Sequence, residues 1–323
     1  MTERVDNVGL LVRLYASKHT HRLLPASVAL GVTAALGPPA RRHRNLAERR
    51  DAERFMQDLL LYTPRAGEAS ALARRYIREK SRIRELFWRP WLLERSRVVG
   101  TEHWEAARAG GRGCVIAFGH MGATFAMPVI LGRLASDLYL VTSPHYWQPL
   151  PPGFVGLALR HLRSEYGEKP LGRGRLITSD SSPERIVALL RSGAAVAVAF
   201  DVAGSAATPF LGRSVALGGG PASLAFSTGA KVLPVVTERH GTRIDLRMIE
   251  PLDPADHPDL RSLRAAIART FELLVLAKPE IVELPWFPSP LVTEALTSRA
   301  APSAWESAQY AARAGDSGTE ELP

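Results

Sequence analysis

A five-residue apolar run, Cys114 to Phe118, constrains the fold more than any other feature of this sequence. It lies between the turn-forming stretches Gly-Arg-Gly and Gly-His-Met-Gly, so it is too short for a free-standing helix and both of its ends are sharp. A continuous apolar run of this length is typical of a strand that is buried on both faces, as in a parallel sheet. His120 follows almost directly, at the strand end where α/β proteins usually place their chemistry.

Strands and helices alternate along the chain on both sides of this run, which predicts an α/β sheet. Apolar runs predict further strands at 137–142, 194–200, 231–237 and 243–249. Helical spacing predicts helices at 102–109, 125–134, 155–166, 183–191, 221–228 and 260–274. Proline-rich and glycine-rich composition predicts loops at 144–154 and 202–220.

Changes in composition divide the chain into three segments. Residues 1–97 are predicted to form a helical N-terminal extension, residues 98–289 the α/β domain, and residues 290–323, rich in Ala, Ser, Gly and Glu, a poorly ordered tail. Within the extension, residues 23–40 are apolar and are followed by the basic cluster Arg41-Arg42-His43-Arg44. Three prolines and two glycines there argue against a spanning helix. Two alternatives stay open: an interfacial segment on an anionic membrane, or a helix packed on the domain.

The formal net charge of +9 predicts anionic partners without naming one. Acidic lipids, an acidic carrier protein, phosphorylated substrates and nucleic acid all fit the charge, but no nucleic-acid recognition motif accompanies it, so nucleic-acid binding is not expected. Cys114 is the only cysteine of the sequence, which excludes a disulfide within the chain and indicates a reducing compartment. Since no signal peptide is evident, we expect a cytoplasmic protein, either free or peripheral on the inner face of the cell membrane.

Two stretches hold the candidate chemistry. In the first, Gly119 and Gly122 bracket His120, whose imidazole can take and return a proton near neutral pH. In the second, Asp201 follows a buried strand, and Arg213 precedes a run of glycines that leads to a helix start at Pro221. Free amides at that helix start, together with a guanidinium, predict a seat for a phosphate or carboxylate, although the same glycines also suit a mobile loop.

Other chemistries find no support in the sequence. It has no Gly-x-Ser-x-Gly elbow, no Walker loop and no Rossmann glycine fingerprint. No metal site can be assembled from residue spacing, and no cofactor is expected.

Three sequence blocks in order, GTEHWEAARAGGRGCVIAFGHMG, AVAVAFDVAG and TPFLGRSVALGGGPASLAFSTGAKVLPV, carry a resemblance to a known family. Across residues 45–251 the chain resembles the lipid A lauroyl/myristoyl acyltransferases and the phosphatidylinositol mannoside acyltransferases, of the lysophospholipid acyltransferase superfamily. The resemblance implies a mixed sheet flanked by helices and transfer of an acyl group from a thioester, on acyl carrier protein or coenzyme A, to a hydroxyl or amine.

The same resemblance assigns expected roles to individual residues. His120 falls on the family's catalytic histidine, and Asp201 and Arg213 fall on its later acidic and phosphate-proximal positions. The expected substrate-binding residues are Gly122, Thr124, Phe125, Asp201, Arg213, Gly220 and Pro221.

The chain departs from the family pattern at two points. Phe125 stands five residues after His120, where the family has its catalytic acid. Asp201, a backbone carbonyl and Thr124 are the acceptors that remain to orient the imidazole. His240 with Asp245 has the family's spacing, but both lie in an expected hairpin, so we interpret the match as a decoy. The run Lys278 to Trp286 replaces the family's His-Pro-Glu-Trp signature, so contacts to the acceptor are expected to differ there.

The function predicted from these residues is acyl transfer with His120 as general base and without the usual paired carboxylate. Absence of that carboxylate favours an amine acceptor, since an amine is a better nucleophile than an alcohol; the product would be a specialised metabolite or a glycolipid. Two alternatives remain: a catalytically inactive acyl-binding or partner subunit that kept the fold, and a membrane-surface protein that binds anionic lipid.

Overall fold

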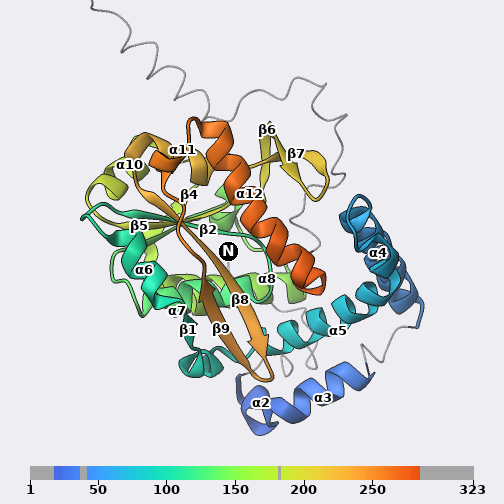
Figure 1. Cartoon of the computed structure of the whole chain (residues 1–323). Coiled ribbons are helices and arrows are strands. Elements are labelled where there is room, and N and C mark those ends of the chain that lie inside the picture. Colours follow the sequence, from blue (N-terminus) through green and yellow to red (C-terminus); the bar gives the residue numbers. More distant parts are fainter. Residues whose placement is uncertain (1–17, 37–41, 181–182, 284–323) are drawn as a thin grey trace, which may run out of the picture.

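A seven-stranded sheet lies at the centre of the computed structural model, which describes residues 18–36, 42–180 and 183–283 (Figure 1). Its strands, in the spatial order β1-β9-β8-β2-β5-β3-β4, are β1 (Val98–Val99), β9 (Arg243–Met248), β8 (Lys231–His240), β2 (Cys114–Phe118), β5 (Ala195–Ala199), β3 (Leu138–Thr142) and β4 (Leu176–Thr178). Strands β8, β2, β5, β3 and β4 run parallel, β9 is antiparallel to β8, and β1 is parallel to β9. The predicted α/β fold with a mixed sheet is confirmed.

Strand β2 occupies the middle of the sheet and is buried along its whole length. It pairs in parallel with β5 on one side and with β8 on the other, so that Cys114 lies opposite both Ala195 and Lys231. Alternate side chains then point to opposite faces: Val115 and Ala117 enter one apolar cluster, while Ile116 and Phe118 enter the other. Burial on both faces explains why the sequence here is a continuous apolar run.

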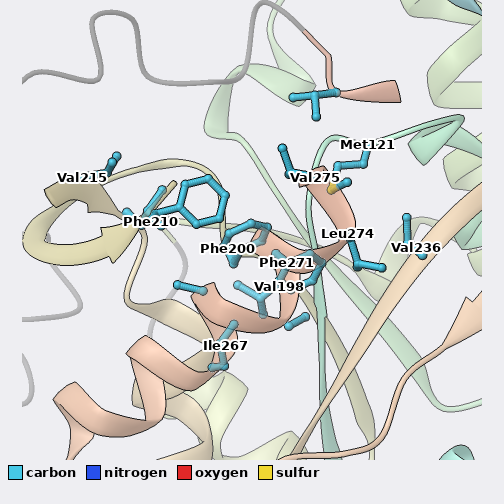
Figure 2. Close-up of a cluster of buried hydrophobic side chains, with 14 of the residues drawn as sticks. Met121, Val198, Phe200, Phe210, Val215, Val236, Ile267, Phe271, Leu274 and Val275 are labelled. Carbon is cyan, nitrogen blue, oxygen red and sulfur yellow. The ribbon is translucent and has the colours of Figure 1, made fainter. Parts of the chain in front are cut away.

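Helices cover both faces of the sheet. One face packs against α10 (Pro183–Arg191), α11 (Gly220–Thr228) and α12 (Leu260–Ala277), and the other against α7 (Met127–Gly132) and the π-helix Leu162–Glu168. The remaining α-helices of the described α/β region are α6 (Thr101–Arg108), α8 (Gly153–His161) and α9 (Lys169–Leu171). Figure 2 shows the apolar cluster to which α12 contributes, where the rings of Phe200 and Phe271 stack at a centroid distance of 4.0 Å.

Helix α12 confirms its predicted amphipathic pattern. Its side chains at Leu263, Ile267 and Phe271 are buried, and these positions recur at helical spacing. The helix begins after Asp259, whose side chain accepts the backbone N–H of Ser262 at 2.7 Å and so satisfies one of the free amides of the first turn.

The N-terminal extension is helical as predicted, and its second half shares the core of the sheet. It contains α2 (Lys18–Leu23), α3 (Ala26–Leu36), α4 (Arg42–Leu60), α5 (Ala69–Phe87) and a 3-10 segment, Pro90–Arg95. Met56 of α4 and Tyr76 of α5 belong to the same apolar cluster as the sheet. In the stretch expected to be either interfacial or packed on the domain, Leu23 and Val28 are exposed, whereas Ala29 and Leu30 are buried. Within the described residues, no helix combines the length and the apolar character that crossing a bilayer requires.

The stretch expected to be a loop at 202–220 contains a β-hairpin, which corrects that prediction. Strands β6 (Ala203–Phe210) and β7 (Arg213–Leu217) pair antiparallel as a separate two-stranded sheet. The two-residue turn needs positive φ at both positions, and Leu211 (53°) and Gly212 (76°) supply it. Leucine seldom adopts this conformation, and β6 does not alternate apolar and polar residues. The hairpin therefore could not be predicted from the sequence.

Smaller corrections concern element ends. The helix expected at 125–134 begins at Met127, after a 3-10 turn over Thr124–Ala126, and Pro128 lies in its first turn. The helix expected at 155–166 changes to a π-helix at Leu162. Edge strand β4 was not predicted, since three residues are too few for a periodic signal. The predicted poorly ordered tail, 290–323, lies outside the described residues.

Candidate active site

His120 and Asp201 follow the carboxyl ends of two adjacent parallel strands. Phe118 at the end of β2 lies opposite Ala199 at the end of β5, so the chain segments that follow emerge side by side. Gly119 allows this close approach, because a Cβ there would lie 2.7 Å from the ring of Phe200. The sheet therefore brings together two residues that are 81 positions apart in the sequence.

Two hydrogen bonds join His120 and Asp201. Asp201 Oδ1 lies 2.8 Å from His120 Nδ1, and Asp201 Oδ2 accepts the backbone N–H of His120 at 2.5 Å. The Asp201 side chain is 1% exposed and the imidazole 18%. Since an ionised carboxylate only accepts hydrogen bonds, Nδ1 carries the hydrogen and Nε2 the lone pair of the neutral ring. This geometry suits a base whose ring is held in one orientation and whose imidazolium form faces a buried negative charge.

The residues between His120 and Phe125 have structural contacts of their own. Thr124 donates its hydroxyl hydrogen towards the backbone carbonyls of Met121 (3.0 Å) and Gly119 (3.3 Å). Gly122 has φ +66°, and a Cβ at this position would lie 2.2 Å from the carbonyl oxygen of Thr237. Of the three acceptors that the sequence left open, the structure places Asp201 at the imidazole Nδ1.

Phe125 packs into an aromatic cluster. Its ring meets Phe87 at a centroid distance of 5.2 Å and Tyr166 at 4.8 Å, and both contacts are edge-to-face. Such pairs contribute about 0.5–1.5 kcal/mol beyond the burial of area. The position five residues after His120 is thus an apolar packing position in this chain.

Arg213 lies at the turn of the β6–β7 hairpin, against α4 and the segment that follows it. Its guanidinium donates a hydrogen bond to the backbone carbonyl of Asp58 and lies 5.6 Å from the ring centroid of Tyr62. Burial lowers the pKa of Arg213, against the opposing charges of Asp58 and Tyr62.

The start of α11, at Gly220 and Pro221, faces a different guanidinium. A Cβ at Gly219 would lie 3.2 Å from a terminal nitrogen of Arg264, on α12. The sequence predicted that Arg213 lies at this helix start. In the structure Arg213 contacts Asp58 and Tyr62, and Arg264 lies at the helix start. The sequence did not predict a role for Arg264, because nothing in the sequence distinguishes it from the other arginines of this amphipathic helix.

A cavity of about 200 Å³ lies between α5 and the segment 279–283, and Phe125 forms part of its wall. Its lining is mostly apolar and aromatic, with a few charged side chains: Tyr76, Lys80, Ile83, Arg84, Phe87, Phe125, Glu280, Ile281, Val282 and Glu283. The segment is tied to the His120 loop, because the Glu283 N–H donates to the His120 carbonyl (2.8 Å) and the Gly122 N–H donates to that of Ile281 (2.7 Å).

Glu283 is a further ionisable group near His120 that sequence reasoning missed. Burial raises the pKa of Glu283 to about 7; the positive charges of His120 and Lys80 oppose this rise, and the negative charge of Asp201 adds to it. In the sequence, the run Lys278 to Trp286 differs from the signature of the family that the chain resembles. That difference drew attention to this segment, but it did not single out Glu283.

The other candidate groups have contacts that keep them apart from this chemistry. His240 is exposed and lies 3.6 Å from Glu238, while Asp245 accepts hydrogen bonds from Arg243 and from the backbone of Arg97. Burial raises the pKa of Cys114 to about 12, so its thiolate is scarce at neutral pH. Among the described residues, no three His, Cys, Asp or Glu side chains gather as a metal site.

No protein-family model matches the chain, and neither does the sequence of any curated protein. Among the solved structures that match, the 1-acyl-sn-glycerophosphate (LPA) acyltransferase PlsC from Thermotoga maritima aligns over 81% of this chain and 97% of its own, with 16% identity and a TM-score of 0.36. A superposition this loose does not define the fold, which rests here on the strand order and register described above.

Proposed function

We propose that the protein is an acyltransferase that moves a fatty or polyketide acyl group from an acyl-carrier-protein or coenzyme A thioester to an amine or hydroxyl acceptor. The observation that carries this proposal is the pairing of His120 Nδ1 with the buried carboxylate of Asp201 at 2.8 Å. The motif order in the sequence, which resembles acyltransferases of the lysophospholipid superfamily, supports the same reaction.

The pair acts as a general base in the proposed reaction. The Nε2 lone pair of His120 takes the proton of the acceptor nucleophile as that nucleophile attacks the thioester carbonyl carbon. The carbon–sulfur bond then breaks, and the imidazolium returns the proton to the departing thiolate. Asp201 holds the required tautomer and stabilises the imidazolium, a role whose loss costs about 10⁴ in rate in another histidine-dependent system.

Two further features support the choice of substrates. The net charge of +9 favours encounter with an acidic carrier protein or with the phosphates of coenzyme A. The cavity between α5 and the segment 279–283 has mostly apolar and aromatic walls, which suits a ligand with a hydrocarbon portion.

The experiment is to incubate the protein with an acyl-carrier thioester and a panel of amine and alcohol acceptors, and to compare it with His120→Ala by mass spectrometry. We expect product from the parent protein and at least about a hundredfold less from the variant, since general-base catalysis contributes about 10²–10⁴. His240→Ala is the matched control and should retain activity. Binding of the acyl thioester without transfer to any acceptor would instead favour an acyl-binding subunit.

A further inference from the structure

The carboxylates of Glu283 and Asp201 differ in the hydrogen bonds that they accept. Asp201 accepts two hydrogen bonds from His120 and is fully buried. Glu283 is half-buried in the cavity wall, and no described residue donates a hydrogen bond to its carboxylate, although its backbone N–H is bonded to the His120 carbonyl. A half-buried carboxylate with open acceptor positions, next to the proposed base, is suited to receive a donor from a ligand.

The surroundings of Glu283 combine apolar walls with few charges. Ile83, Phe87, Phe125, Ile281 and Val282 form the apolar part of the lining. The charged or titratable groups around it are Tyr76, Lys80 and Arg84 of α5, Glu280 of its own segment, and His120 and Asp201 across the loop. Burial outweighs the cations and raises the pKa of Glu283 to about 7, so its carboxyl can both take up and release a proton near neutral pH.

We propose that Glu283 binds the ammonium form of a primary-amine acceptor and removes its first proton, which makes an amine the acceptor of the reaction. This rests on the proposed acyltransferase function and narrows its acceptor class. An alcohol loses one proton during acyl transfer, for which His120 is sufficient. An alkylammonium loses two, and the site offers two groups to take them.

The protons and bonds balance as follows. The ammonium R–NH₃⁺ gives one proton to the Glu283 carboxylate and becomes R–NH₂. Its nitrogen attacks the thioester carbonyl carbon, His120 takes the second proton, the carbon–sulfur bond breaks, and His120 protonates the thiolate. Glu283 releases its proton to water, so that one ammonium and one thioester give one amide, one thiol and one proton. The apolar wall assists the first step because desolvation disfavours the charged ammonium and lowers its pKa towards that of the carboxyl group.

The test compares Glu283→Gln with the parent on three acceptors of equal heavy-atom number: n-pentylamine, cationic at pH 7, and O-butylhydroxylamine and n-pentanol, both neutral. We expect kcat/KM for n-pentylamine to fall about tenfold to a hundredfold, the size of a lost hydrogen bond to a charged group. Transfer to O-butylhydroxylamine, which needs no first deprotonation, should change less than about threefold. Glu250→Gln, at an exposed position, is the matched control.

Equal losses on n-pentylamine and O-butylhydroxylamine, no loss on n-pentylamine, or preference of the parent for n-pentanol would overturn the role of Glu283. Calorimetry without thioester gives a readout that does not depend on turnover. The parent should bind n-pentylamine at least about tenfold more tightly than n-pentanol, and Glu283→Gln should lose that preference. If no acceptor is acylated while this preference holds, the acyltransferase proposal fails and the amine site stands. If the preference is absent, the amine site fails by itself.

Discussion

The carboxylate that contacts the His120 ring comes from Asp201, 81 residues away, and not from the position five residues on. At that nearer position Phe125 packs against Phe87 and Tyr166, where an aromatic ring stabilises the fold and a carboxylate would be desolvated. The partner of a histidine is therefore set by the register of two strands, which local spacing does not encode. His240 and Asp245 are also five residues apart, but they do not pair with each other. His240 lies near Glu238, and Asp245 accepts a hydrogen bond from Arg243.

Phe125→Asp, which puts a carboxylate five residues after His120, is expected to lower stability without raising activity. The substitution removes two edge-to-face contacts and adds a carboxylate to an apolar wall, which together cost at least about 2 kcal/mol of unfolding free energy. Nδ1 of His120 is already bonded to Asp201, so the new carboxylate has no vacant position to fill. Urea denaturation and an acyl-transfer assay measure the two effects. A gain in transfer rate would show that Asp201 does not serve as the orienting acid.

Strand β2 illustrates what burial does to a whole element. Every side chain from Cys114 to Phe118 is buried, so the one thiol of the chain lies in the middle of the sheet, where the pKa of Cys114 rises to about 12. A thiol in this environment is inert.

Cys114 of the folded protein should therefore resist a thiol reagent such as iodoacetamide at pH 8, and should react completely in denaturant. Mass spectrometry of the intact protein measures the labelled fraction with time. Labelling of the native protein at the rate of a small thiol would mean that β2 opens or lies at an edge.

Helix α5 is joined to α2 by a buried charge cluster. Glu85 lies 3.2 Å from His21 and 2.9 Å from Arg89, and all three side chains are 5% exposed or less. Burial raises the pKa of Glu85, but the hydrogen bonds from His21 and Arg89 outweigh this and leave the pKa below its usual value. Stability gained from a carboxylate with a lowered pKa is present above the unfolded pKa and is lost as the pH falls through the folded one.

Removal of this carboxylate by Glu85→Ala should cost about 3–5 kcal/mol of unfolding free energy, because it leaves Arg89 buried without its counter-ion. Urea denaturation at pH 7 gives the value. Glu102→Ala, at an exposed position of α6, is the control and should change the unfolding free energy by less than about 0.5 kcal/mol. An equally small effect of Glu85→Ala would mean that α2 does not dock on α5.

For the molecule as a whole, the parts that could be predicted from sequence are those with a strong local signal. The apolar runs of β2 and β5 and the amphipathic pattern of α12 each predicted an element correctly. The alternation of strands and helices along the chain predicted the α/β class. His120 could be placed because it follows such a run. The β6–β7 hairpin could not, because its turn depends on positive φ at Leu211. Glu283 could not either, since its proximity to His120 arises from a return of the chain after α12.

The central claim is that His120, held by Asp201, is the base of acyl transfer, and the single-turnover rate of Asp201→Asn tests it most directly. The account predicts a fall of about 10²–10⁴, because an amide at this position can donate to Nδ1 and fix the wrong tautomer. The variant should stay folded by circular dichroism, and Asp256→Asn, at an exposed position, should match the parent. A folded Asp201→Asn with a rate within about threefold of the parent would contradict the account.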